Sequence, residues 1–498
     1  MGRTQATPLP GGALADPTRA QRHAHEGILR RQAAREPAAR TYARALPIVP
    51  VRARGLTIEG ADGRRYLDCL SGAGTLALGH NHPVVLEAIR KVLDSGAPLS
   101  ALDLATPVKD AFLTELLRTL PPDLAERAHV RFCGPAGSNA VETAYALVRA
   151  ATGRDGLLAF TGAGWVRSTG ALDDPLEDAH GVAIPCLPSP QDHRCHLGAV
   201  GDDGSDLVPR RTESLPDQLR QGAPLPAGVI VEPVRSEGGV VPAPDSWLAR
   251  VRQFTADRSI PLIADESRTG VGRTGAFWAV EHSGVTPDVM VLSNAIGGSL
   301  PLAVVVYRDD LDTGHPGTPA ETFPGNQLAM AAGTATLAHV RENALAERAA
   351  TLGAGMLDQL RPLVSEFTCV GDVRGRGLMI GVELVDPGGD SPQGERAPAP
   401  SDARGPVAGG GAGAPVTPGS GPHRHRPHSA APELAAAVQQ ECLRRGLIVG
   451  LAGRAASVVQ LLPPLTITDE QAAAVLDRLA DAVRAAARCR GGGTAAAR

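Results

Sequence analysis

The sequence predicts an α/β protein with a mainly parallel sheet, joined to a smaller α+β domain. From residue 98 to about 341, short apolar runs alternate with amphipathic segments, as is typical of buried parallel strands connected by helices. After residue 342 longer helical segments dominate, and 498 residues suffice for two cores. The expected division is a mobile arm (1–40), an N-terminal segment of the small domain (41–97), the large α/β domain (98–341), the C-terminal α+β domain (342–488) and a frayed tail (489–498).

The N-terminal arm is polar and rich in alanine and arginine, so it is expected to be mobile and only partly helical. After it, residues 51–59 and 65–70 flank the turn-forming residues 60–63, Gly-Ala-Asp-Gly, a pattern that predicts a β-hairpin.

The large domain is predicted from its periodicity. A helix is expected over 108–120, where Phe112, Leu116 and Leu120 share one face, and another over 139–151. The expected strands are 130–133, 157–160, 229–232, 260–265, 289–293 and 302–307.

The C-terminal domain is expected to contain a strand near 379–385 and helices at 433–445 and 469–487. A Gly/Pro/Ser/Ala-rich insert at 387–432 interrupts it and cannot bury enough apolar surface to become ordered. The insert holds three histidines, for which two interpretations remain open: a metal site, or a low-complexity run without one. These are His423, His425 and His428.

Composition excludes several classes of function. A net charge of −4 with 20% charged residues offers no electrostatic basis for binding nucleic acid or an anionic membrane. The chain has no apolar run of about 18 residues and no apolar signal-peptide core at its start, so a cytoplasmic protein is expected. Its seven cysteines are scattered without CxxC pairs, which favours reduced thiols.

Three segments carry candidate ligand chemistry. Residues 132–139, Phe-Cys-Gly-Pro-Ala-Gly-Ser-Asn, follow a strand and open a helix, so Gly137 and Ser138 lie either at a phosphate site or in an ordinary loop. Asp265 ends a strand at the sheet edge where α/β proteins bind ligands, and serves either a ligand or a local cap or ion pair. Asn294 closes another strand at the same edge.

Together these segments resemble the class III (fold type I) aminotransferases, most closely the diaminobutyrate–2-oxoglutarate transaminases, over residues 41–485 apart from the insert. The matching segments are 72–83 (Gly-Ala-Gly-Thr-Leu-Ala-Leu-Gly-His-Asn-His-Pro), 106–110 (Thr-Pro-Val-Lys-Asp), 132–137, 232–233 (Glu-Pro), 237–239 (Glu-Gly-Gly), 265–266 (Asp-Glu), 272–275 (Gly-Arg-Thr-Gly), 295–298 (Ala-Ile-Gly-Gly), 325–327 (Gly-Asn-Gln), 374–379 (Arg-Gly-Arg-Gly-Leu-Met) and 462–465 (Leu-Pro-Pro-Leu).

The resemblance implies a homodimer with two pyridoxal phosphate (PLP) sites at the subunit interface, and amino transfer between 2,4-diaminobutyrate and 2-oxoglutarate. It also implies roles for single residues. Gly137 and Ser138 match the phosphate cup, and Asp265 matches the partner of the pyridinium nitrogen. Thr322 matches the threonine that reaches the phosphate of the neighbouring subunit, and Glu237 the glutamate that gates the substrate carboxylate.

One departure from the family removes the group that makes it an enzyme. Asn294 stands where the resemblance places the Schiff-base lysine. An amide neither forms a Schiff base with the cofactor aldehyde nor moves the proton afterwards. The chain has only two lysines, Lys91 and Lys109; Lys109 matches an ordinary lysine of the family and Lys91 is expected on a polar helix face.

Further departures fall on cofactor and substrate positions. Gly164 replaces the tyrosine that stacks on the pyridine ring, although Trp165 offers a π-face beside it. Arg268 replaces a glutamine near the cofactor's phenolic oxygen. Gln460 replaces the arginine that pairs with the α-carboxylate of 2-oxoglutarate, and an amide cannot reproduce that bidentate clamp. Arg235 and Ser236 stand where Gln-Gly precedes Glu237 in the family.

Because these changes concentrate at one site while the turns and strand ends are intact, a lone sequencing error does not explain them. We expect Arg268 to pair with Asp265 and to stabilise a site that holds no PLP. The favoured function is a transaminase-like protein with lost or strongly impaired catalysis, acting as a partner subunit or as a binder of a small anionic metabolite.

Two alternatives stay open: a PLP enzyme acting on 2,4-diaminobutyrate or a related ω-amino acid with non-covalent cofactor chemistry, or a new activity in the same cleft. The expected cofactor is PLP without covalent attachment, or none. The expected partners are a second copy, or an active aminotransferase paralogue in a heterodimer, and a small amino acid or oxo acid. No metal, nucleic acid or membrane is expected.

Overall fold

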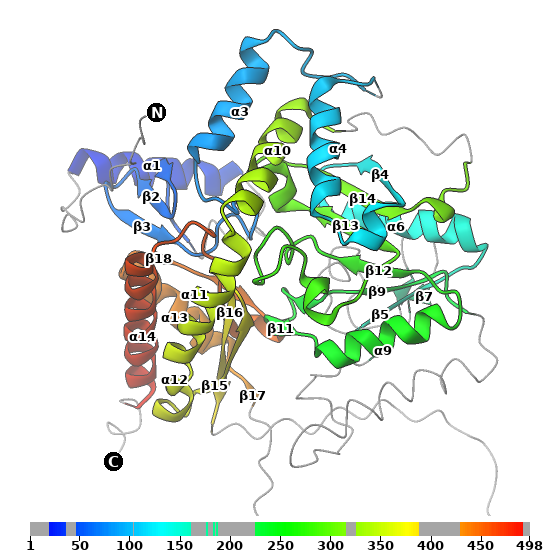
Figure 1. Ribbon diagram of the computed structural model, residues 1–498. Coiled ribbons are helices and arrows are strands. Elements are labelled where there is room, and N and C mark those ends of the chain that lie inside the picture. Colours follow the sequence, from blue (N-terminus) through cyan, green and yellow to red (C-terminus); the bar gives the residue numbers. More distant parts are fainter. Residues whose placement is uncertain are drawn as a thin grey trace, which may run out of the picture.

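The computed structural model describes residues 19–35, 46–102, 104–160, 176–177, 183–184, 186–187, 225–314, 325–387 and 429–491. Figure 1 shows a large sheet with its helices on one side of the molecule and a second, smaller group of strands and helices on the other. This is the α/β architecture that the sequence predicts.

The central sheet has seven strands in the order β4-β14-β13-β12-β9-β5-β8. Neighbouring strands from β13 to β8 pair in parallel, and β14 alone runs antiparallel to its neighbours β13 and β4. The prediction of a mainly parallel sheet is therefore confirmed, and β5 and β13 begin and end at the predicted residues. The strands are β4 (Ala128–Cys133), β5 (Leu157–Phe160), β8 (Cys186–Leu187), β9 (Gly228–Val231), β12 (Leu262–Asp265), β13 (Val289–Ser293) and β14 (Ala303–Arg308).

Helices cover both faces of this sheet because alternate residues of each buried strand point in opposite directions. Ile263 packs with Val141 and Val148 of α6 on one face, whereas Leu262 packs with Trp247 of α9 on the other. The core continues under α4 and α10, where Phe112 of α4 is fully buried with Met330 of α10. The helices are α3 (Pro83–Asp94), α4 (Pro107–Thr119), α5 (Pro122–Ala125), α6 (Gly137–Thr152), α9 (Asp245–Ala256) and α10 (Gln327–Glu342).

The C-terminal part is built on a sheet in which β15, β16, β20 and β19 follow one another and β17 pairs with β16. Figure 1 places α11, α13 and α14 beside it. The elements are α11 (Leu345–Leu360), α12 (Pro362–Glu366), β15 (Val370–Arg376), β16 (Met379–Asp386), β17 (Ser429–Ala430), α13 (Pro432–Arg444), β19 (Gly450–Ala452), β20 (Val458–Leu461) and α14 (Asp469–Gly491).

Two predicted boundaries in this part are wrong. The insert was expected to extend to residue 432, but Ala430 pairs with Val385 in an antiparallel ladder and α13 begins at Pro432. Pairing with a strand edge supplies hydrogen bonds that composition alone does not predict. Likewise the tail expected from residue 489 is still helical to Gly491. The rest of the insert, with its three histidines, lies outside the described residues.

The N-terminal segment joins the C-terminal part in one sheet. The predicted hairpin is present as β2 and β3, with β1 added at its edge, and β18 pairs in parallel with β3 through Leu447 and Leu67. The helix of the N-terminal arm is α1, and its His25 Nε2 donates a hydrogen bond to Pro47 O at 3.1 Å. The elements are α1 (Arg19–Arg35), β1 (Pro50–Arg54), β2 (Thr57–Gly60), β3 (Arg65–Asp68) and β18 (Leu447–Ile448).

The remaining elements are short. None of the helices in the described part of the chain is long and apolar enough to cross a membrane. The short strands are β6 (Leu176–Glu177), β7 (Ala183–Ile184), β10 (Val234–Arg235) and β11 (Val241–Pro242), and the 3₁₀ helices are η1 (Ala279–Ser283), η2 (Asn294–Gly297), η3 (Asp309–Leu311) and η4 (Arg454–Ala456).

Candidate functional site

The candidate site lies where β12 and β13 end. The two strands are parallel, with Asp265 in register with Val291, so their carboxyl ends reach the same edge of the sheet. Asp265 is the last residue of β12, and Asn294 directly follows β13. The start of α6 lies at the same edge, since a Cβ on Gly137 would stand 3.0 Å from Ser293 Oγ. The fold therefore brings Gly137, Asp265 and Asn294 together, as the sequence predicts.

Asn294 has a left-handed backbone with φ 58°, a conformation that asparagine tolerates better than most residues. It opens η2, and its side chain is half-buried. The amide Nδ2 donates a hydrogen bond to Ser267 O at 3.0 Å. Asn294 thus links the end of β13 to the loop that follows β12.

Asp265 is buried, with 8% of its surface exposed, and its Oδ1 accepts a hydrogen bond from the Ser267 N–H at 3.0 Å. Burial raises the pKa of this carboxyl, while the Ser267 hydrogen bond and the positive charge of Arg268 act in the opposite direction. A buried acid at this position is suited to a cationic partner such as a protonated ring nitrogen.

The start of α6 has the properties of a phosphate site. Two hydroxyls, Ser267 Oγ and Ser293 Oγ, are buried there without a hydrogen-bond partner among the described residues. Both lie beside Gly137, where a Cβ would approach them to 3.3 and 3.0 Å, so a side chain would fill the space between them. Together with the free N–H groups at the N-terminus of a 16-residue helix, these hydroxyls fit a phosphate group.

Ser267 and Ser293 were missed by the sequence reasoning. A signal for each was present, since Ser267 lies two residues after Asp265, where aspartate often accepts a backbone hydrogen bond, and Ser293 directly precedes Asn294. Their unpaired hydroxyls, however, appear only once three separate segments are packed together.

The expected ion pair between Arg268 and Asp265 is wrong. Arg268 Nη1 instead forms an ion pair with Glu237 Oε1, and the two side chains are 28% and 30% exposed. The physical reason is solvation: Glu237 is partly open to water, whereas pairing with Asp265 would require the guanidinium to be desolvated in the core. Arg268 therefore does not act as a buried counter-ion that fixes the fold of an empty site.

Gln460 joins the same cluster from the C-terminal sheet. Its Nε2 donates to Ser236 Oγ at 3.1 Å, and both side chains are buried. Ser236 Oγ also lies 3.5 Å from Arg268 Nη1, at the limit of a hydrogen bond. Arg235, the residue before Ser236, is 9% exposed and lines a small cavity with Trp247. Four of the positions that the resemblance marks as departures thus lie in one region: Arg235, Ser236, Arg268 and Gln460.

Glu266, next to Asp265, is a second buried acid. Its Oε1 accepts from the Val280 N–H at 2.9 Å, and its Oε2 accepts from the Thr269 hydroxyl. Burial raises the pKa of Glu266 from 4.5 to about 7, and these hydrogen bonds offset only part of the shift.

This shift predicts a pH dependence of stability. Because the folded state favours protonated Glu266, its contribution to the free energy of unfolding is complete below pH 4.5 and is lost as the pH rises to about 7. Glu266→Gln removes the titrating carboxyl. When the pH is raised from 5 to 8, we therefore expect the free energy of unfolding of the variant to rise on the order of 3 kcal/mol relative to that of the unmodified protein. Urea unfolding at both pH values measures it. Glu126→Gln, at an exposed glutamate, is the control, and an equal pH response in both variants would refute the assignment.

Several predicted features cannot be placed. Gly164, Trp165 and Thr322 lie outside the described residues. Within the described part of the chain, no group of three histidine, cysteine or acidic side chains is arranged to hold a metal ion. The expected dimer stays a prediction. Four exposed leucines lie in the last turn of α3 and in the segment between α3 and α4. They are Leu93, Leu99, Leu102 and Leu104.

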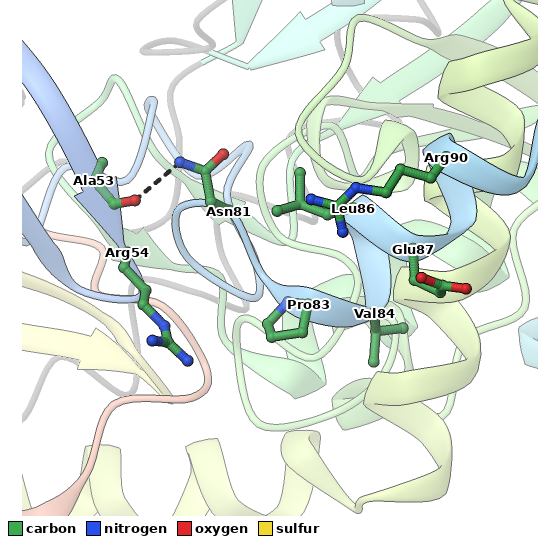
Figure 2. Close-up of a pocket in the computed structure, with 8 residues that line it drawn as sticks. All are labelled: Ala53, Arg54, Asn81, Pro83, Val84, Leu86, Glu87 and Arg90. Carbon is green, nitrogen blue, oxygen red and sulfur yellow. Dashed lines mark hydrogen bonds between the residues drawn. The ribbon is translucent and has the colours of Figure 1, made fainter. Parts of the chain in front are cut away.

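A separate surface hollow of about 660 Å³ lies between β1 and the start of α3. Figure 2 shows the side chains that line it, with Asn81 Nδ2 donating to Ala53 O at 2.9 Å. Arg54 and Arg90 also line it, but none of the residues at the ends of β12 and β13 does. This hollow is therefore distinct from the candidate site.

The fold and the site agree with a family-wide comparison. Residues 38–483 match the family model described as "Aminotransferase class-III". The chain belongs to the class III aminotransferases. Their cofactor is PLP. The N-terminus of α6 with the hydroxyls of Ser267 and Ser293, here called the phosphate cradle, fits the PLP phosphate, and Asp265 fits its ring nitrogen.

Individual relatives extend this result. A diaminobutyrate–2-oxoglutarate aminotransferase of Rhizobium meliloti is 44% identical over 466 residues, covering 92% of each chain. Another, from Haemophilus influenzae, is 38% identical over 94% of this chain and 97% of its own. Among solved structures, an (S)-enantioselective omega-transaminase from Thermomicrobium roseum has a TM-score of 0.75 at 25% identity, covering 93% of this chain and 98% of that one. The fold is therefore that of the fold type I PLP enzymes.

Proposed function

We propose that this class III aminotransferase is a diaminobutyrate–2-oxoglutarate transaminase-like protein that binds PLP without covalent attachment and has lost, or nearly lost, transamination. In this proposal it acts as a binder of small amino acids or oxo acids of that substrate class, or as the partner of an active subunit. The names of the relatives at 44% and 38% identity support the substrate class.

One observation carries the loss of catalysis: the residue that follows β13 at the cofactor edge is Asn294. By the family resemblance this is the position of the Schiff-base lysine. Its amide is already used in a hydrogen bond to Ser267 O, and an amide has no basic nitrogen with which to move a proton. Loss of a general base typically reduces the rate by about 10²- to 10⁴-fold.

Neither lysine of the chain is placed to act instead. The side chain of Lys91, on α3, is 75% exposed, and its Nζ lies 3.9 Å from Glu87. Lys109, in the first turn of α4, has its Nζ 5.2 Å from the centre of the Phe132 ring on β4, two strands away from β13. A covalent link to PLP therefore has no amine at the end of β13.

The remaining residues still suit the cofactor. When bound, PLP supplies an electron sink for cleavage of bonds at an amino-acid carbon. The N-terminus of α6 with Ser267 and Ser293 would hold the phosphate, and Asp265 would keep the ring nitrogen protonated. The site thus retains recognition while lacking the group that performs proton transfer.

The visible absorbance of the purified full chain on addition of PLP, before and after borohydride, tests the proposal. We expect a spectral change on binding and no cofactor retained after borohydride treatment and denaturation. Covalent retention of the cofactor on a lysine would refute the proposal, and the absence of any spectral change would refute PLP binding.

A further inference from the structure

The cluster around Arg268 connects two parts of the molecule. Arg268 lies in the loop after β12, Ser236 and Glu237 follow β10, and Gln460 lies on β20 of the C-terminal sheet. Gln460 contacts Ser236, and Arg268 contacts both Ser236 and Glu237. Gln460 and Ser236 are 224 residues apart in the sequence, so this cluster joins the C-terminal sheet to the loop that follows Asp265.

Glu237 is fixed through its backbone but not through its side chain. Its carbonyl oxygen accepts a hydrogen bond from the Gly453 N–H at 2.8 Å. Gly239, two residues later, has a backbone φ of 102° and is closely packed, since a Cβ there would stand 3.1 Å from Arg374 Nη2 and 3.2 Å from Gly453 Cα. Only the carboxylate of Glu237, 30% exposed, is therefore free to leave Arg268 without moving the loop.

The guanidinium of Arg268 has donors to spare. Its hydrogen bond and its ion pair to the described residues both use Nη1. Nε and Nη2 form the edge that matches a carboxylate with two parallel hydrogen bonds. The side chain is 28% exposed, so a small ligand can reach this edge. Asp265 at the end of β12 and Asn294 at the start of η2 both form hydrogen bonds with Ser267, the residue before Arg268.

We propose that Arg268 is the carboxylate anchor of this site, meaning the residue whose guanidinium binds the carboxylate of the ligand; this inference rests on the proposed function. The neutral amide of Gln460 cannot form such a charged contact. The ligand is a small oxo or amino acid whose carboxylate binds the Arg268 guanidinium in competition with Glu237. Gln460, held by Ser236, contributes no charge to the ligand. The positive charge that binds the carboxylate would thus come from Arg268 in the loop after β12, and not from position 460 on the C-terminal sheet.

Calorimetric titration of the full chain with 2-oxoglutarate, without PLP, tests the anchor. We expect binding by the unmodified protein, and Arg268→Gln to weaken it roughly tenfold or more because a charge-assisted hydrogen bond is lost. Glu237→Gln should tighten binding several-fold, because the competing carboxylate is removed. The matched control is Arg376→Gln, which breaks another partly exposed ion pair, the one between Arg376 and Asp245 at 2.9 Å.

No 2-oxoglutarate binding by the unmodified protein, or equal affinity in the Arg268→Gln variant, would overturn the anchor. Unchanged or weaker binding by Glu237→Gln would overturn the competition, and this variant remains informative even if Arg268→Gln fails to fold. A PLP titration of the same proteins separates the two proposals. If PLP still changes the spectrum while 2-oxoglutarate binding does not depend on Arg268, the anchor fails and the proposed function stands.

Discussion

Replacing Asn294 by lysine is expected to make PLP attachment covalent. The new amine would extend from the end of β13 beside Asp265 and the phosphate cradle, where the family's lysine is implied. Borohydride treatment followed by mass spectrometry of the denatured chain should then show the cofactor mass on residue 294. Conversion of 2,4-diaminobutyrate with 2-oxoglutarate should rise by about 10²-fold or more, because the variant regains a general base.

The Asn294→Arg variant is the matched control, because its guanidinium is long and charged but stays protonated and cannot act as the nucleophile. A small loss of stability is expected in the Asn294→Lys protein, since φ 58° costs a residue other than asparagine or glycine roughly 1 kcal/mol, and the bond to Ser267 O is lost. A lysine variant that binds PLP but yields no covalent product would show that position 294 is not the cofactor position.

Placing a side chain at Gly137, in the phosphate site at the start of α6, is expected to weaken PLP binding strongly. The Cβ of a valine at Gly137 would stand 3.0 Å from Ser293 Oγ and 3.3 Å from Ser267 Oγ, and its methyl groups would occupy the space between these hydroxyls. Loss of the helix N-terminal and hydroxyl contacts to the phosphate should weaken PLP binding by about 100-fold. Absorbance titration measures the affinity, and a parallel titration with inorganic phosphate shows whether the phosphate contacts alone are affected.

Gly355→Val is the control, because a Cβ at that position in α11 meets nothing within 4 Å. Circular dichroism and thermal unfolding of both variants should show that the sheet and its helices are retained. Wild-type affinity in the Gly137→Val protein would place the phosphate elsewhere.

Local sequence signals predicted much of this fold. β5 and β13 were predicted to the residue because their apolar runs are bounded by polar residues and a glycine turn. The carboxyl-edge placement of Asp265 and Asn294 followed from the strands alone, since parallel strands end on one side. Periodicity could not predict β17, because a two-residue strand gains its stability from the edge of β16 rather than from its own sequence.

The sequence by itself determined the family and the mainly parallel sheet, because strand patterns and motif residues are local properties of the chain. It also shows Asn294 at the position where the resemblance places the Schiff-base lysine. Only the tertiary structure decided which acid Arg268 contacts. Glu237 lies 31 positions before Arg268 and Asp265 only three, yet the guanidinium pairs with Glu237. A long side chain pairs where folding leaves an acid in reach and still partly solvated, and sequence distance does not measure either condition.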